Sequence, residues 1–152
     1  MADSDPKLAD TWARLSGLFS SRRDALFEQL AELGLNPPHG VALMSLLHAG
    51  PTRMGDMAET MVCDASYITA VADRLEELGL VERRNSPDDR RAKQLALTAK
   101  GEKVARRLDA VVTEPPPAMT ALSKADRDAL ARIARKLGEP DTSRWMPPRS
   151  LR

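Results

Sequence analysis

Residues 85–101, NSPDDRRAKQLALTAKG, change character twice within one short stretch. They begin as a charged turn around Pro87 and continue as an apolar–polar alternation over residues 94–98. They then reach Thr98, a residue type that favours the position before a helix. Residues 80–84, LVERR, precede the turn and are typical of a partner strand. The stretch therefore predicts a β-hairpin with a proline and two arginines at its tip, followed at once by a helix.

Positive charge is concentrated at this hairpin. Residues 80–108 hold nine basic and four acidic side chains, a net charge of +5, whereas the whole chain of 152 residues carries a formal net charge of +1. A basic segment on an otherwise acidic chain is typical of a surface that binds a polyanion. A charged hairpin that is merely solvated stays open as the alternative. Aromatic residues make up only 3% of the chain, which argues against a stacking platform for single-stranded nucleic acid.

Helical periodicity precedes the hairpin. The elements predicted there are helices over residues 7–33, 38–48, 56–61 and 65–78, and a short strand over residues 52–54. Gly55 and Asp64 are the expected N-caps of the third and fourth helices. These two helices have the spacing of a helix–turn–helix, with Ile68 and Val71 on the inner face of the second. Val62 stands at the turn position where glycine is common, so we expect a turn conformation that a β-branched residue tolerates.

Two further helices are predicted after the hairpin. Thr98 begins one, which the prolines at 115–117 interrupt, and Ser123 begins the other, which reaches Leu137 before Gly138. The fold class is therefore mainly α with a small β-hairpin wing. The predicted units are an N-terminal dimerisation helix (1–36), a winged helix–turn–helix lobe (37–98), C-terminal dimerisation helices (99–138) and a tail (139–152). A second copy of the chain is the expected partner of the long first helix.

The sequence offers little for catalysis, metal binding or membrane insertion. It contains no glycine-rich phosphate loop and no nucleophile elbow, so we expect neither an enzyme nor a cofactor. His39, His48 and Cys63 match no compact zinc pattern. Cys63 is interpreted as a small buried hydrophobe, with a redox sensor as the alternative. A single cysteine, a polar N-terminus and the lack of a long apolar run predict a cytoplasmic protein without a membrane segment.

The order of elements and two runs resemble the MarR family of bacterial transcriptional regulators. These runs are DRLEELGLVERR (residues 73–84) and DDRRAKQLALTAKG (residues 88–101), and the resemblance extends roughly over residues 8–137. It implies a homodimer that binds a pseudo-palindromic DNA duplex, acting as a repressor that occludes a promoter. The winged helix used as a scaffold for protein partners, without DNA binding, is the alternative function.

The resemblance also implies which residues touch DNA. On the helix over residues 65–78 these are Ser66, Tyr67, Thr69 and Arg74; on the wing they are Asp89, Arg90, Arg91 and Lys93. Arg91 would enter the minor groove and Asp89 would orient it, with a plain ion pair within the turn as the alternative. The family often has arginine where Ala65 and Ala70 stand, so this helix is poor in positive charge. We therefore expect the wing to supply most of the electrostatic affinity.

Arg22 lies in the apolar stripe of the first helix, where a cation needs a partner. Members of the family often bind phenolic or carboxylate effectors between the dimer helices and the DNA-binding lobe. Trp12, Phe19, Arg22 and His48 are therefore candidates to line a pocket for a small aromatic or phenolic acid. An ion pair between subunits, or an exposed side chain that snorkels to solvent, remains the alternative for Arg22.

Overall fold

The computed structural model describes residues 5–86 and 93–138, so the predicted tail lies outside the described residues. The helices are α1 (Pro6–Glu32), α2 (Pro37–Ala49), α3 (Met54–Thr60), α4 (Ala65–Glu77), α5 (Ala99–Thr113), α6 (Pro117–Thr120) and α7 (Lys124–Lys136). The strands are β1 (Thr52–Arg53), β2 (Val81–Asn85) and β3 (Lys93–Leu97), which form one antiparallel sheet in the order β1-β3-β2. The mainly helical fold with a small hairpin is confirmed.

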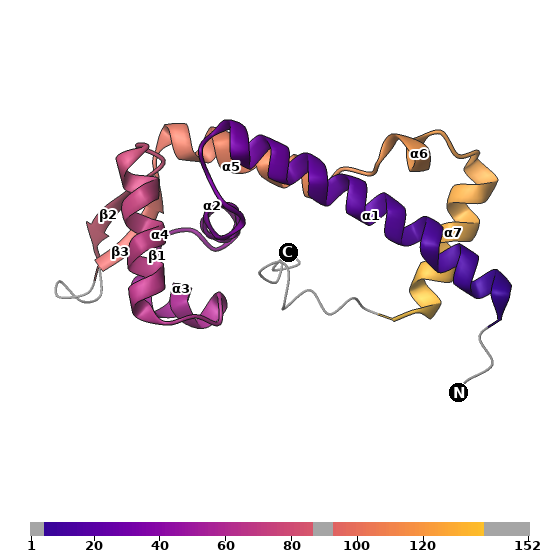
Figure 1. Ribbon diagram of the computed structural model, residues 1–152, viewed down its shortest axis with the longest axis horizontal. Helices are drawn as coiled ribbons and strands as arrows, with labels where there is room; N and C mark the ends of the chain where they lie inside the picture. The colour runs from indigo at the N-terminus through magenta and orange to yellow at the C-terminus, as the bar shows by residue number, and fades with distance from the viewer. Residues whose placement is uncertain (1–4, 87–92, 139–152) are drawn as a thin grey trace.

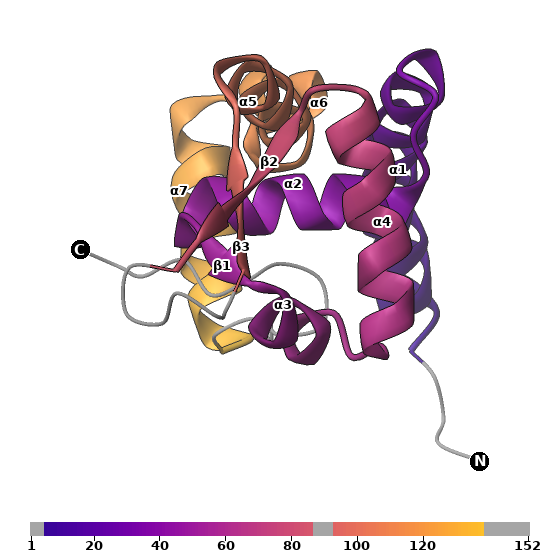
Figure 2. The ribbon, with the colours of Figure 1, turned by 90° about the vertical axis from the view of Figure 1, so that its left-hand side faces the viewer.

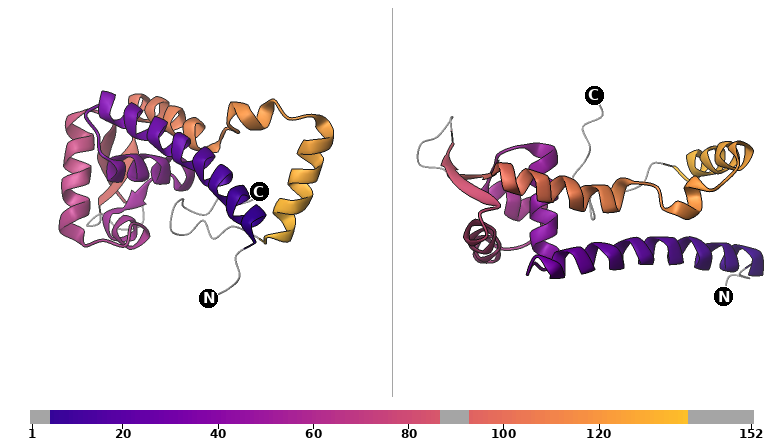
Figure 3. Two further views of the ribbon diagram at one scale, coloured as in Figure 1. Left: turned by 45° about the vertical axis from the view of Figure 1, so that its right-hand side comes forward. Right: turned by 90° about the horizontal axis from the view of Figure 1, so that it is seen from above.

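The molecule divides into two regions, shown at opposite ends of Figure 1. The lobe comprises α2, α3, α4 and the sheet, which Figure 2 shows end-on. The arm comprises α1, α5, α6 and α7. Helices α1 and α5 leave the lobe side by side, and α7 stands at the far end of the arm (Figures 1 and 3). The long first helix therefore packs against a helix of its own chain, a partner that its sequence pattern did not reveal.

The hydrophobic core lies in the lobe and at the adjoining ends of α1 and α5. Its most deeply buried large side chains include Leu30, Leu43, Met57, Ile68, Leu75, Leu95 and Leu108. By contrast, α6 and α7 contain no buried residue. The core crosses the predicted boundaries after residues 36 and 98, and the division into units stays a prediction.

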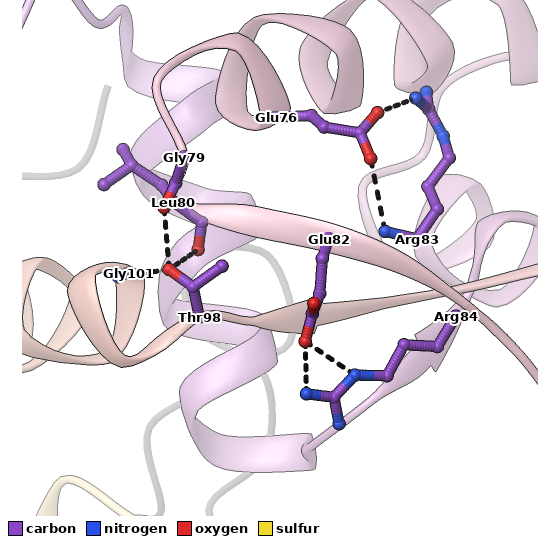
Figure 4. Close-up of polar contacts among 8 residues, drawn as sticks. All are labelled: Glu76, Gly79, Leu80, Glu82, Arg83, Arg84, Thr98 and Gly101. Carbon is purple, nitrogen blue, oxygen red and sulfur yellow. Dashed lines mark hydrogen bonds and ion pairs between the residues drawn. The ribbon is translucent and has the colours of Figure 1, made fainter.

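The exit from β3 into α5, where the arm joins the lobe, is tightly built (Figure 4). The Thr98 hydroxyl donates to the Gly79 carbonyl oxygen at 2.7 Å and accepts the Gly101 N–H at 3.0 Å, so Thr98 is the predicted N-cap. A Cβ at position 101 would stand 1.8 Å from the Leu80 carbonyl oxygen. Only glycine therefore allows α5 to cross the start of β2 this closely.

Three helix ends share one hydrogen-bonding pattern, known as the Schellman motif. The residue after each helical cap takes a positive φ: Gly34 (+65°) after α1, Gly79 (+66°) after α4 and Val62 (+51°) after α3. At α3, Val62 N–H donates to the Glu59 carbonyl and Cys63 N–H to the Ala58 carbonyl, so the motif is complete. The expectation that Val62 would adopt a conformation tolerated by a β-branched residue is therefore wrong. The turn geometry requires the left-handed region, and valine occupies it at a cost in strain.

One element assignment needs correction. Helix α3 begins at Met54, with Arg53 rather than Gly55 at the N-cap, because the strand ends at Arg53 and the chain turns directly into the helix. The prolines at 115–117 follow the end of α5, as predicted, and lead into a short helix that the sequence pattern did not indicate. Pro116 is the extended cap and Pro117 the first residue of α6, a position where a missing N–H costs nothing.

Candidate nucleic-acid interface

Helix α4 is held on the lobe by one face and exposes the other. Its buried residues are Ile68, Val71, Ala72 and Leu75, which confirms the predicted inner positions of Ile68 and Val71. Ser66, Thr69, Ala70 and Asp73 lie on the exposed face. The helix therefore presents a polar surface that starts at its N-terminus and continues into its acidic C-terminal half.

Asp64 organises the N-terminus of α4. Its Oδ1 accepts the Tyr67 N–H at 3.0 Å and the Ser66 hydroxyl at 2.6 Å, as expected of an N-cap. These two bonds, the one from Ser66 first, lower the pKa of the Asp64 carboxyl, so the cap stays charged near neutral pH. The carboxylate also lies where the helix dipole is positive.

The hydroxyls of two predicted contact residues, Ser66 and Thr69, already donate within the protein. Ser66 donates to Asp64, and Thr69 donates to the Ala65 carbonyl oxygen at 2.8 Å. Each hydroxyl has a single hydrogen, so only its oxygen lone pairs remain for a partner. In this arrangement both side chains suit a donor such as an exocyclic base amine better than a phosphate oxygen.

Arg74 lies at the opposite flank of α4 from the hairpin. Its Nη1 pairs with Glu77 Oε2 at 3.2 Å. Together with Tyr67 it borders a cavity of about 380 Å³ between α4 and the loop that joins α1 to α2. The residues lining this cavity are Gly34, Asn36, Pro38, His39, Tyr67, Ala70, Val71 and Arg74. Burial and the charge of Arg74 lower the pKa of His39.

Among the predicted wing residues only Lys93 is described. It begins β3, is exposed, and its Nζ donates to Asn85 Oδ1 at 2.7 Å across the hairpin. Asp89, Arg90 and Arg91 lie outside the described residues. The register from Val81–Leu97 to Asn85–Lys93 nevertheless fixes where the wing leaves the lobe.

Much of the positive charge around the hairpin is already paired. Arg83 on β2 bridges Asp73 and Glu76 on α4, while Arg84 pairs with Glu82 on its own strand. The hydrogen bond that Arg83 donates to Asp73 is the largest of the effects that raise the pKa of Arg83. On α5, Arg106 pairs with Glu102 and Arg107 reaches Glu32 of α1. Since Arg83 and Arg107 pair with acids outside residues 80–108, the +5 of this segment overstates the charge that the region offers to a partner.

Sequence reasoning missed the bridge made by Arg83. The i, i+4 spacing of Glu102 and Arg106 and the i, i+2 spacing of Glu82 and Arg84 on a strand are visible in the sequence. The contacts of Arg83 with Asp73 and Glu76 arise only when β2 folds back along α4 (Figure 4 shows the contact with Glu76).

The four candidates for an effector pocket have different surroundings within one chain. Trp12 and Phe19 are 66% and 71% exposed. Arg22 Nη2 donates to the Glu114 carbonyl oxygen at 2.9 Å and approaches that of Ala110 at 3.4 Å, so it caps the C-terminus of α5. His48 Nε2 lies 2.8 Å from Asp109 Oδ1, which joins α2 to α5. The partner of Arg22 is thus a helix end of its own chain, and the pocket stays a prediction.

Cys63 packs at the edge of the core, half-buried, directly before Asp64. Burial first, and the negative charge of Asp64 second, raise the pKa of its thiol. A raised pKa lowers the thiolate fraction, which fits the interpretation as a small apolar residue. Over residues 5–86 and 93–138, no three His, Cys, Asp or Glu side chains gather as metal ligands. The helices in these same ranges include none with the length and apolarity to span a membrane.

The geometry defines a winged helix–turn–helix: α3 and α4 form the helix pair, and the β2–β3 hairpin follows α4 at once. The model of the MarR family matches residues 35–93. HTH-type transcriptional repressor MdtR of Bacillus subtilis is 31% identical over 102 residues, which cover 67% of this chain and 66% of MdtR, just under two thirds of that relative. The chain belongs to the MarR family, which is not a family of enzymes.

Solved structures agree with this assignment. The YusO protein from Bacillus subtilis superposes with a TM-score of 0.71 at 28% identity, covering 89% of this chain and 96% of YusO. The F27L mutant of MepR from S. aureus, bound to an oligodeoxyribonucleotide, superposes with a TM-score of 0.63 at 18% identity, covering 83% of this chain and 94% of MepR. The second similarity concerns the fold alone.

Proposed function

We propose that this protein regulates transcription by binding double-stranded DNA as a homodimer, with one α4 helix of each copy in the major groove. The observation that carries the proposal is the two-faced α4. Ile68, Val71 and Leu75 fix it on the core, while Ser66 and Thr69 lie on the exposed side, with oxygen lone pairs that can still accept a hydrogen bond. A helix presented in this way matches the geometry by which helix–turn–helix proteins read base edges.

The wing supplies the second part of the interface in this proposal. Arg91 would enter the minor groove with Asp89 orienting it, and Arg90 and Lys93 would contact the DNA backbone. The pairing of Arg83 and Arg84 with neighbouring carboxylates supports the assignment, because these two arginines have less charge to offer to the DNA backbone.

The arm supports the homodimer. Leu8, Trp12 and Phe19 on α1 and Ile133 and Leu137 on α7 are large apolar side chains exposed in a single chain. Apolar surface of this kind is typical of an interface, and a second copy is the partner that closed symmetry favours. Two copies joined through the arms would present two α4 helices to a pseudo-palindromic site.

Regulation as a ligand-responsive repressor is the finer part of the proposal. A small aromatic or phenolic acid would bind between arm and lobe near Trp12, Phe19, Arg22 and His48. It would have to draw Arg22 from the α5 carbonyls, or His48 from Asp109, so binding would loosen the joint between the two regions. Titration with salicylate-like acids tests this idea. It fails if these acids change neither the melting temperature nor DNA binding.

A footprint on the DNA flanking the gene, followed by fluorescence anisotropy on the protected duplex, tests DNA binding itself. We expect affinity to fall steeply with salt. Arg91→Ala should weaken binding by about 10- to 100-fold and reduce the salt slope by about one. Arg106→Ala is the matched control, because Arg106 lies on α5 and is already paired with Glu102.

Two results would contradict these expectations in different ways. A protein that binds no duplex at any salt concentration is the protein–protein scaffold instead. If Arg91→Ala binds like the parent while the parent binds DNA, the major role given to the wing is wrong.

A further inference from the structure

The outer face of α4 changes from polar to acidic along its length. Ser66 and Thr69 are followed on the same face by Asp73 and Glu76, at steps of three, four and three residues. The side chains of Asp73 and Glu76 are 53% and 40% exposed. A helix that carries two carboxylates beside its contact residues would repel the phosphates that flank a major groove.

Arg83 lies against both carboxylates. Its guanidinium donates to Asp73 through Nη2 and to Glu76 through Nη1. The backbone N–H of Arg83 donates to Glu76 Oε1 at 3.3 Å. The Arg83 side chain is only 27% exposed, so it is more enclosed than either acid. One cation from β2 thereby ties the hairpin to α4 and lowers the negative charge of its outer face.

We propose that Arg83 is a positioning residue for DNA binding, which acts by neutralising Asp73 and Glu76 on the reading helix. The inference rests on the proposed function. Arg83 need not touch DNA in this role. It makes an acidic helix acceptable to a polyanion, and it couples the orientation of α4 to that of the wing through charged hydrogen bonds to two carboxylates. Arg84, one residue further on, lacks this role because it pairs with Glu82 on its own strand.

The experiment is anisotropy on the footprinted duplex over a range of salt concentrations, with four variants of the full chain. We expect Arg83→Gln to weaken binding about 10-fold at low salt and less at high salt, where the exposed carboxylates are screened. The matched control Arg84→Gln should change affinity by less than about 3-fold. Urea unfolding of each variant checks that it is folded.

Two further variants separate the effect of the carboxylate charges from the effect of the contact between Arg83 and α4. Asp73→Asn/Glu76→Gln/Arg83→Gln removes the bridge and both charges together, and should restore binding to within about 3-fold of the parent. Asp73→Asn/Glu76→Gln retains Arg83 and frees its charge, so it should bind more tightly than the parent with a steeper salt dependence. Since the double variant Asp73→Asn/Glu76→Gln retains Arg83, it still tests the repulsion if variants of Arg83 fail to fold.

Each outcome decides something. If Arg83→Gln binds like the parent, or if the triple variant stays as weak as Arg83→Gln, neutralisation by Arg83 is wrong although DNA binding stands. If the double variant binds no more tightly than the parent, the repulsion is also wrong. A parent that binds no duplex at any salt removes the proposed function and this inference with it.

Discussion

The lobe and the arm differ in how far their apolar side chains are buried within one chain. In the lobe, apolar faces of α2, α3, α4 and the sheet meet in one core, and the ends of α3 and α4 are closed by backbone hydrogen bonds. In the arm, α7 contains no buried residue, and Leu137 is 80% exposed although it continues the apolar stripe of that helix. The lobe is stabilised by a core that it shares with the adjoining ends of α1 and α5, whereas the rest of the arm carries apolar surface that one copy of the chain does not cover.

Two glycines of the arm helices test this difference, because Gly101 is buried where α5 joins the lobe and Gly17 is exposed on α1. A Cβ at Gly101 would meet the Leu80 backbone at 1.8 Å, whereas a Cβ at Gly17 on α1 has nothing within 4 Å. We expect Gly101→Ala to lower the free energy of unfolding by at least about 3 kcal/mol, measured with urea, because neither backbone can move without breaking the Thr98 cap. Gly17→Ala should raise it by up to about 1 kcal/mol through helix propensity. Equal effects at the two sites would mean that the backbone around Gly101 and Leu80 can shift to accept a methyl group at no more cost than the exposed part of α1.

The arm offers the next largest effect. If a second copy covers α7, Ile133→Gln together with Leu137→Gln should raise the dimer dissociation constant at least about 100-fold, because two apolar side chains lose their burial. Sedimentation at several concentrations measures this. Arg132→Gln introduces the same residue beside the apolar stripe and should leave dimerisation almost unchanged. A parent that sediments as a monomer, or an unaffected double variant, would contradict the role given to the arm.

Local features of both regions were more predictable from sequence than contacts between distant segments, for a physical reason. Helix starts were predictable because the capping hydrogen bond of an N-cap joins residues close in sequence, as at Asp64, Thr98 and Ser123. The alternation over residues 94–98 predicts a strand, because it too is a local pattern. The packing of α1 against α5 and the hydrogen bond from Arg22 to the Glu114 carbonyl join segments far apart in sequence. No local sequence pattern predicts such contacts. The exposed contact face of α4 was predictable from its period, but the neutralisation of that face by Arg83 was not.

The three Schellman motifs, at the ends of α1, α3 and α4, allow a comparison with a smaller expected effect. Val62 is 92% exposed and holds φ at +51°, where Gly34 and Gly79 serve the other two Schellman motifs. Val62→Gly should therefore gain about 1 kcal/mol in urea unfolding, since strain is relieved and little packing is lost. The reciprocal Gly79→Val places a Cβ in open space at φ +66°, so its expected loss of about 1–2 kcal/mol isolates the backbone term. Destabilisation by Val62→Gly would show that the valine side chain has a contact that outweighs its strain.

The smallest expected effect concerns the N-terminus of α2, where lobe and arm meet. Asn36 N–H donates to His39 Nδ1 at 3.0 Å, which requires a neutral ring at that atom. Burial, together with the charge of Arg74, lowers the pKa of His39 from its ordinary value of 6.5. The folded state therefore binds fewer protons than the unfolded state, so this contribution is present above the unfolded pKa and is lost as pH falls below it.

We expect the parent to lose somewhat more stability than His39→Gln between about pH 7.5 and pH 5.5 in urea unfolding, by less than about 1 kcal/mol because the ring is partly screened by solvent. Glutamine is the matched control, since its side-chain oxygen can accept the same Asn36 N–H at the third helical position without titrating. The sign is the informative part. Because the hydrogen bond from Asn36 N–H requires a neutral His39 ring, acid should weaken the N-terminal cap of α2. A parent that gains stability in acid relative to His39→Gln would mean that the protonated ring is the bound form, donating rather than accepting at this cap.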